Sequence, residues 1–217
     1  VLAGPWAGQM LADLGADVIK IENPDGGDDT RAWGPSFVMG KDGENLSAAY
    51  YHSTNRGKRS ISVDLKTEEG RETVHRLIAT ADIVIENFKV GGLTKYVLDY
   101  ASLAQKHPKL IYCSITGFGQ TGPYAPRPGY DALIQAMGGV MSLTGEPNGS
   151  PQKVGIPVAD LFAGLYGCIG ILAALNHRNA TGEGQQIDIG MLDTHVAWLA
   201  NQGMNYLATG ENPPRLG

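Results

Sequence analysis

One stretch of the chain, residues 154–170, constrains the fold more than any other, because it changes character at Asp160. Apolar residues and a proline precede Asp160, which suits an extended segment. After it, apolar side chains recur every three or four residues, the pattern of a helix with one buried face. We expect that face to contain Leu161, Phe162, Leu165, Tyr166, Ile169, Leu172 and Leu175.

Asp160 therefore stands where an extended segment enters a long helix, and its carboxylate has two interpretations. It can cap the helix by accepting hydrogen bonds from the first free N–H groups. It can also be a catalytic carboxylate, because nearby glycines leave room for a backbone or a ligand to approach closely. These glycines are Gly155, Gly164, Gly167 and Gly170.

Length and net charge limit the size of the hydrophobic core and the classes of partner that the chain can bind. The 217 residues suffice for one core, and the formal net charge of −5 argues against a general nucleic-acid binder. The chain does not begin with methionine and closes on a loop-like tail, so we expect a piece of a longer protein. Small acidic or phosphorylated ligands remain open as partners.

The two cysteines, Cys113 and Cys168, fit no metal or redox spacing and are expected to be buried, reduced thiols of an intracellular protein. We expect a cytoplasmic location, or a mitochondrial one if the source is eukaryotic. No apolar run comes close to the ~20 residues needed to span a bilayer, so no membrane association is expected.

Helical and strand-like patterns alternate along most of the chain, which predicts an α/β fold with a parallel, doubly wound sheet. Residues 25–58 read as a long irregular excursion with aromatic residues such as Tyr50, and loops of this length tend to be functional. Expected strands are 17–22, 60–64, 82–86, 110–115 and 186–189; expected helices are 6–14, 67–80, 102–106, 130–138, 161–178 and 191–208.

Several common chemistries are absent from the pattern. The sequence contains neither the glycine fingerprint of dinucleotide-binding folds nor a P-loop, and its five histidines show no zinc-ligand spacing, so no metal site is expected. Ligands of a doubly wound sheet gather at the carboxyl ends of its strands. The most glycine-rich turn after a strand is residues 116–123.

The basic cluster and Asp131 each have two possible interpretations, one structural and one functional. Arg56, Lys58 and Arg59 form a basic cluster before a strand, which is either a solvated edge or a phosphate site. Asp131 either caps the helix that begins beside it or, together with Asp160, takes part in covalent or acid–base chemistry.

Taken together, these residues resemble the N-terminal half of the family III CoA-transferases, the group that includes formyl-CoA, carnitine and succinate-hydroxymethylglutarate CoA-transferases. The matching landmarks run in the family's order across nearly the whole chain. They are Ala3-Gly-Pro5, residues 14–22, Gly27-Asp-Asp-Thr-Arg31, residues 55–60, Glu86-Asn-Phe88, residues 114–123, Gly129-Tyr-Asp131 and Val158-Ala-Asp160.

The resemblance implies that Asp160 is a nucleophile that attacks an acyl-CoA thioester and forms an aspartyl anhydride, then an aspartyl-CoA thioester. It implies coenzyme A or acyl-CoA as substrate, no tightly bound cofactor, and a carboxylic acid acceptor, with a dicarboxylate of the succinate or glutarate type favoured. Positions similar to those that line the CoA site are Leu2, Ala3, Val63, Asp64, Leu65, Lys66, Asn87, Phe88, Lys95, Tyr130 and Asp131.

Three positions depart from the patterns of particular family branches, and these departures narrow the expected activity. Leu2 and Asn23 stand where the formyl-CoA type carries glutamine and arginine, which weakens an oxalate assignment. Tyr130 stands where the α-methylacyl-CoA racemases of this superfamily carry a histidine, which makes racemisation the runner-up. A CoA-binding module without turnover is the third hypothesis.

The resemblance also implies an interlocked homodimer and a Rossmann-like large domain. We expect residues 1–190 to belong to that CoA-binding domain, whose first strand would precede Val1. Residues 191–217 would then be a helix and the start of a linker towards a smaller domain.

Overall fold

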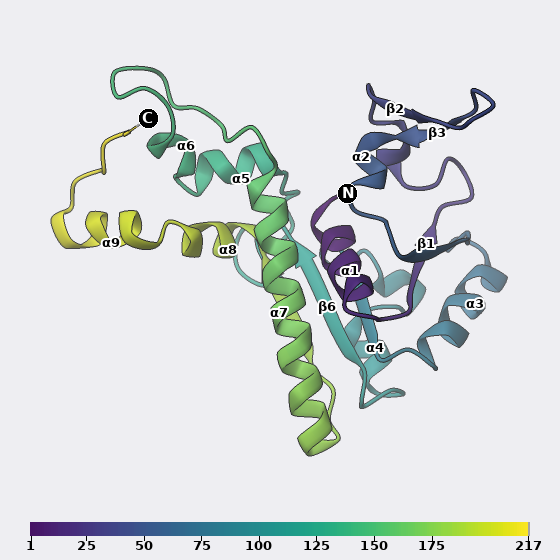
Figure 1. The fold of residues 1–217 in the computed structure, drawn as a ribbon. Helices are drawn as coiled ribbons and strands as arrows, with labels where there is room; N and C mark the ends of the chain where they lie inside the picture. The colour runs from purple at the N-terminus through teal and green to yellow at the C-terminus, as the bar shows by residue number, and fades with distance from the viewer. Residues whose placement is uncertain (217) are drawn as a thin grey trace.

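The computed structural model describes residues 1–216 and shows parallel strands between layers of helices (Figure 1). The strands are β1 Val18–Glu22, β2 Phe37–Met39, β3 Asn45–Ala48, β4 Lys58–Ser62, β5 Ile83–Glu86, β6 Ile111–Thr116 and β7 Gln186–Gly190. The α-helices are α1 Ala3–Asp13, α2 Ala49–His52, α3 Glu68–Ile78, α4 Tyr100–Ala104, α5 Asp131–Met137, α6 Val140–Leu143, α7 Val158–Thr181, α8 Met191–Trp198 and α9 Ala200–Thr209. Two 3₁₀ helices, η1 Asp29–Ala32 and η2 Thr94–Tyr96, complete the set.

The parallel strands fall into two hydrogen-bonded groups. In one, β1 pairs with β4, with Val18 opposite Lys58. In the other, β6 lies between β5 and β7, with Ile111 opposite Ile83 and Tyr112 opposite Gln186. The prediction of a parallel α/β fold is confirmed, although no ladder within residues 1–216 joins the two groups into one continuous sheet.

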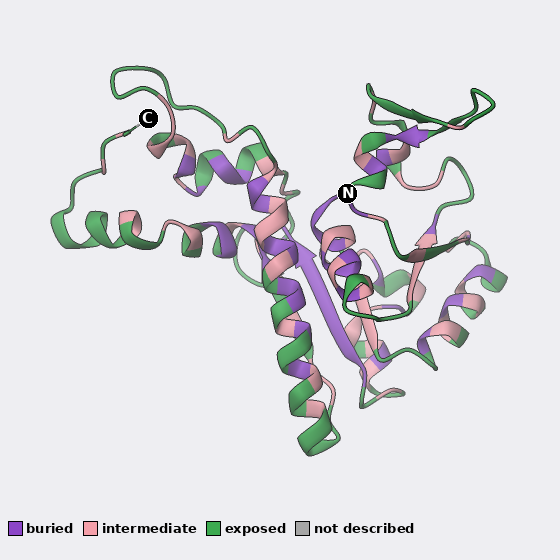
Figure 2. Cartoon of the chain, in the orientation of Figure 1, coloured by how far each residue is buried: buried purple, intermediate pink, exposed green. Residues whose placement is uncertain are grey.

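Alternate residues of β6 supply the cores on its two faces, which is why the strand reads as a continuous apolar run. Ile111, Cys113 and Ile115 pack towards α1 and α7. Tyr112 belongs to the opposite core, with residues of α3 and α4 such as Val74 and Leu103. The central strand is buried along its whole length (Figure 2).

Helix α7 buries the face opposite to the one that its periodicity predicts. The large side chains of Tyr166, Ile169 and Leu172 are exposed, and the buried face consists mainly of small residues. The reason is the close approach of α1, because a Cβ atom on Gly164 would lie 2.6 Å from the carbonyl oxygen of Ala3. The prediction of close backbone approach at the glycines is thus confirmed at Gly164, while the predicted buried face is wrong.

By length and composition, α7 is also apolar enough to cross a membrane, with a mean hydropathy of 1.9 over its best window. The expectation that no run reaches this level is therefore wrong. Its leucine, isoleucine and alanine residues give the helix its high hydropathy, while its glycines permit tight packing. Helix α7 packs against α1, α5, α8 and the strands β6 and β7, which is the environment of a core helix.

Two further expectations are corrected. Residues 25–58 are more regular than predicted, since they contain η1, the antiparallel pair β2–β3 and α2. The expected helix 191–208 is broken into α8 and α9, because Ala200 adopts a positive φ of 46° that no right-handed helix accommodates. The division of domains at residues 190 and 191 stays a prediction.

Candidate active site

Asp160 lies in the first turn of α7, but its carboxylate serves another helix. Pro157 is the N-terminal cap of α7, and no side chain caps the helix from that position. The carboxylate of Asp160 instead faces the N–H of Ala3, the first residue of α1, whose own cap Leu2 offers no side-chain hydrogen bond. Asp160 therefore lies beside the N-terminal ends of two helices, where the helix dipoles favour an anion.

Asp131 takes the capping role that the sequence suggested for Asp160. Its Oδ1 accepts a 2.9 Å hydrogen bond from the N–H of Ala159, and its Oδ2 accepts a 2.8 Å bond from Nε2 of Gln135. Asp131 is the first residue of α5 and caps α7 rather than its own helix, so the predicted cap of α5 is wrong.

The protonation of Asp160 reflects this setting. Burial and the charge of Asp131 raise the pKa of Asp160 to about 6, although the nearby Ala3 N–H opposes the rise. The carboxylate is thus ionised at neutral pH and yet poorly solvated, which suits a nucleophile.

Tyr50 is a residue of this site that the sequence did not assign. It lies on α2, and burial together with the charges of Asp160 and Asp131 raises its pKa to about 12. Its ring meets that of Trp33 edge to face, with centroids 5.4 Å apart. The only signal in the sequence was the aromatic content of residues 25–58, because nothing local indicates that this excursion returns to Asp160.

A buried polar network holds the excursion in place. Glu22, at the end of β1, accepts hydrogen bonds of 2.8 and 2.9 Å from Arg31, 3.0 Å from the Tyr51 hydroxyl and 2.6 Å from Ser60. Burial alone would raise the pKa of Glu22, but these hydrogen bonds together hold it far below its usual range. Since Tyr51 is adjacent to Tyr50, the network fixes α2 beside the site.

The residues expected to line a CoA site divide into groups. Leu2 and Ala3 are buried at the start of α1, where the Ala3 N–H faces Asp160, and a Cβ on neighbouring Gly4 would lie 3.7 Å from Asn87. The remaining positions follow the carboxyl ends of β4 and β5 or lie beyond them. They are Val63, Asp64, Leu65 and Lys66 after β4, Phe88 after β5, Lys95 in η2, and the exposed Tyr130 before α5.

The residues of the basic cluster make contacts within the chain, and a phosphate site there stays a prediction. The guanidinium groups of Arg56 and Arg59 pair at the surface with Asp13 and Asp17. The buried Nζ of Lys58 donates to the carbonyl oxygens of Pro5 and Thr54, each at 2.7 Å. Lys58 begins β4, at the opposite end of that strand from residues 63–66. These cations hold α1 and the amino ends of the strands together.

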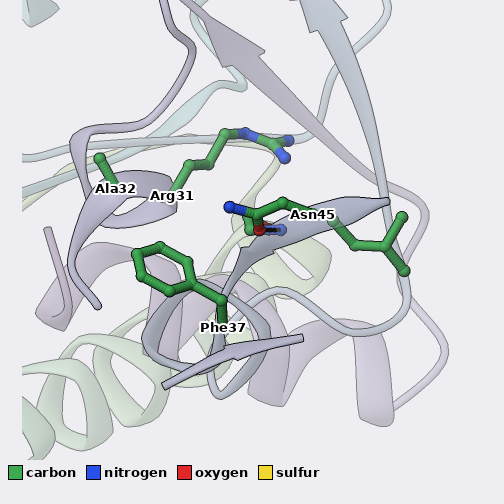
Figure 3. Close-up of a pocket in the computed structure, with 6 residues that line it drawn as sticks. Arg31, Ala32, Phe37 and Asn45 are labelled. Atoms are coloured by element: carbon green, nitrogen blue, oxygen red, sulfur yellow. Dashed lines mark hydrogen bonds between the residues drawn. The ribbon is translucent and has the colours of Figure 1, made fainter. Parts of the chain in front are cut away.

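Two hollows lie near this region, and neither is lined by Asp160. One, of about 410 Å³, lies between η1 and the β2–β3 pair, and Figure 3 shows Arg31, Phe37 and Asn45 around it. The other, of about 280 Å³, lies at the carboxyl ends of β1 and β4 and includes Asn23 and Ser62. Arg31 contributes to both, but its guanidinium is already paired with Glu22. Within residues 1–216, no group of three or more His, Cys, Asp or Glu side chains is placed to hold a metal ion.

The fold and the site thus define a parallel α/β protein with a desolvated aspartate between two helix N-termini. Residues 1–217 match CoA-transferase family III, and the chain belongs to that family.

Several named proteins have sequences similar to this chain. Over 217 residues it is 68% identical to the succinate–glutarate CoA-transferase of Agrobacterium fabrum, covering 100% of this chain and 54% of the relative. It is 44% identical to the human succinyl-CoA:glutarate CoA-transferase, covering 100% of this chain and 48% of the relative. A crystal structure of a CAIB/BAIF family protein from Brucella suis superposes with a TM-score of 0.96 at 63% identity, covering 100% of this chain and 57% of that one. The chain spans about half the length of the relatives that it matches.

Proposed function

We propose that the protein containing this chain transfers CoA from an acyl-CoA donor to a carboxylic acid, with Asp160 as the nucleophile. The observation that carries this proposal is the setting of the Asp160 carboxylate, which is largely removed from water, faces the Ala3 N–H and has a pKa raised to about 6. A helix cap alone does not require a desolvated carboxylate beside a second one.

In the proposed reaction, a carboxylate oxygen of Asp160 attacks the thioester carbonyl carbon, and the C–S bond breaks to give an aspartyl anhydride and CoA thiolate. The thiolate then attacks the Asp160 carbonyl, which yields an aspartyl-CoA thioester and releases the donor acid. The acceptor carboxylate attacks that thioester, and the returning thiolate cleaves the second anhydride to release the new acyl-CoA and free Asp160.

Dicarboxylic acids of the succinate and glutarate class are the proposed substrates, because the named relatives act on succinate and glutarate or their CoA esters. The test is transfer by the full-length protein from succinyl-CoA to a panel of mono- and dicarboxylic acids. New CoA esters with dicarboxylates would support the assignment. Transfer only to monocarboxylates would overturn it, and turnover only of a 2-methylacyl-CoA, without an acceptor acid, would point to a racemase.

We also propose that a second copy of the chain is the partner, as an interlocked homodimer. Large apolar side chains on α5, α7, α8 and α9 are exposed in the single chain; for example, Ile169 is 53% and Leu207 75% exposed. Helix α9 has no buried residue and projects from the body of the molecule (Figure 2). Light scattering of the full-length protein tests this proposal, which a monomer at micromolar concentration would contradict.

A further inference from the structure

The six residues that lead into the Asp160 turn are held by one side chain of α5. Gln135 is fully buried, with 0% of its surface exposed. Its Oε1 accepts a 2.9 Å hydrogen bond from the N–H of Val154, and its Nε2 donates to the carbonyl of Ile156 at 3.4 Å. The same Nε2 donates to Oδ2 of Asp131 at 2.8 Å.

These contacts fix the orientation of the amide. Gln135 meets a donor, the Val154 N–H, on one side and the acceptors of Asp131 and Ile156 on the other. An inverted amide would place donor against donor and acceptor against acceptor, with unsatisfied buried groups on both sides. Its neighbour Asp131 in turn receives the Ala159 N–H, immediately before Asp160.

We propose that Gln135 is a positioning residue for the reactive carboxylate. It holds residues 154–156, which bend before α7 begins, and fixes the rotamer of Asp131, which caps α7 and faces Asp160. This inference rests on the proposed function for its kinetic consequence, but the hydrogen bonds that it invokes can be tested without turnover.

Charged and titratable groups approach this site from several elements. Asp131 on α5 and Tyr50 on α2 interact with Asp160, while His195 on α8 interacts with Asp131. A change at residue 135 therefore reaches Asp160 mainly through Asp131, the only one of these groups that Gln135 contacts within residues 1–216.

The test compares Gln135→Leu and Gln135→Glu with Gln105→Leu, a control at an exposed glutamine that ends α4. In Gln135→Leu the positioning is lost, and we expect kcat to fall by roughly 10- to 100-fold with KM for the acyl-CoA nearly unchanged, as for small misplacements of a reacting group. Gln135→Glu keeps an acceptor for Val154 but brings a carboxylate against Asp131, so the acid limb of the kcat profile should move to higher pH.

Backbone hydrogen exchange supplies the readout that does not depend on activity. We expect the Val154 and Ala159 amides to exchange faster in Gln135→Leu than in the wild type or the Gln105→Leu control. Unchanged exchange, or unchanged kcat and acid limb in both variants at position 135, would overturn the inference. A wild-type protein that fails to transfer CoA would instead contradict the proposed function, and the exchange measurement would still decide whether Gln135 holds this segment.

Discussion

Asp131 accepts a 2.9 Å hydrogen bond from the N–H of Ala159, the residue immediately before Asp160 in α7. Because Asp131 caps α7, the carboxylate of Asp160 is left free of its own helix and faces the first N–H of α1 instead. Helix α7 is thus capped by a carboxylate from α5, while its own carboxylate lies beside the start of α1. The arrangement places two carboxylates close together, and the charge of one raises the pKa of the other.

The first prediction concerns this pair. Asp131→Asn removes the negative charge that raises the pKa of Asp160 while it keeps an oxygen for the Ala159 N–H. Since Asp160 must be ionised to attack, the acid limb of kcat/KM, expected near pH 6 in the wild type, should move to lower pH. Asp42→Asn, at an exposed loop position, is the control. An acid limb that stays in place in Asp131→Asn would show that Asp131 does not tune the nucleophile.

The second prediction is that the desolvated carboxylate of Asp160 lowers the stability of the folded state. The pKa of Asp160 rises from 3.8 to about 6 on folding, so the folded state binds the proton more tightly and loses stability as the pH rises between these values. Asp160→Asn should therefore be more stable than the wild type above pH 6, by up to about 3 kcal/mol at about 1.4 kcal/mol per pKa unit.

Urea denaturation at several pH values measures this difference. We expect it to disappear below about pH 3.8, where Asp160 is protonated in both states. A variant that is less stable than the wild type at pH 8 would mean that the carboxylate stabilises the fold, as an ordinary cap does.

The third prediction concerns the network that holds residues 25–58. Glu22→Gln leaves the Arg31 guanidinium without its anion, and breaking a buried pair in this way costs about 3 to 5 kcal/mol. The pKa of Glu22 is lowered on folding from 4.5, so its contribution is present above that pH and is lost as the pH falls. The difference in the free energy of unfolding between Glu22→Gln and the wild type should therefore decrease in acid. Glu44→Gln, at an exposed position, should change stability little, and an equally small effect at Glu22 would contradict the network's role.

The fourth prediction concerns the contact between α1 and α7. Alanine normally favours a helix over glycine by about 1 kcal/mol, but a Cβ at Gly164 would lie 2.6 Å from the Ala3 carbonyl oxygen and 3.0 Å from the Trp6 ring. Gly164→Ala should push α1 away, lower the free energy of unfolding by about 1 to 3 kcal/mol and reduce transfer, since the Ala3 N–H faces Asp160. Gly203→Ala in α9, where the nearest atom is the Leu199 Cβ at 3.3 Å, is the matched control. Equal changes in melting temperature in the two variants would contradict the close contact between α1 and α7 at Gly164.

The sequence was informative where function depends on local patterns. Strand and helix order predicted the parallel α/β fold, and the change of pattern at Asp160 located the first turn of α7. The helix expected at 67–80 begins beside Thr67, whose hydroxyl caps it by accepting a 3.0 Å hydrogen bond from the Gly70 N–H.

Relations between distant segments were not predictable in the same way. Periodicity marks the largest apolar side chains as buried, whereas the close approach of α1 selects the small face of α7. Asp131 lies 28 residues from the amide that it caps, and Tyr50 reaches Asp160 only through the folded excursion. No pattern within one helix reports such tertiary partners.

The most direct test of the central claim is chemical trapping of Asp160. The full-length protein is incubated with succinyl-CoA and hydroxylamine, and the peptide that contains Asp160 is examined by mass spectrometry, with Asp160→Asn as control. We expect a donor-dependent hydroxamate at Asp160, absent from the variant. A protein that transfers CoA to an acceptor acid yet never shows a modified Asp160 would contradict the proposed nucleophile.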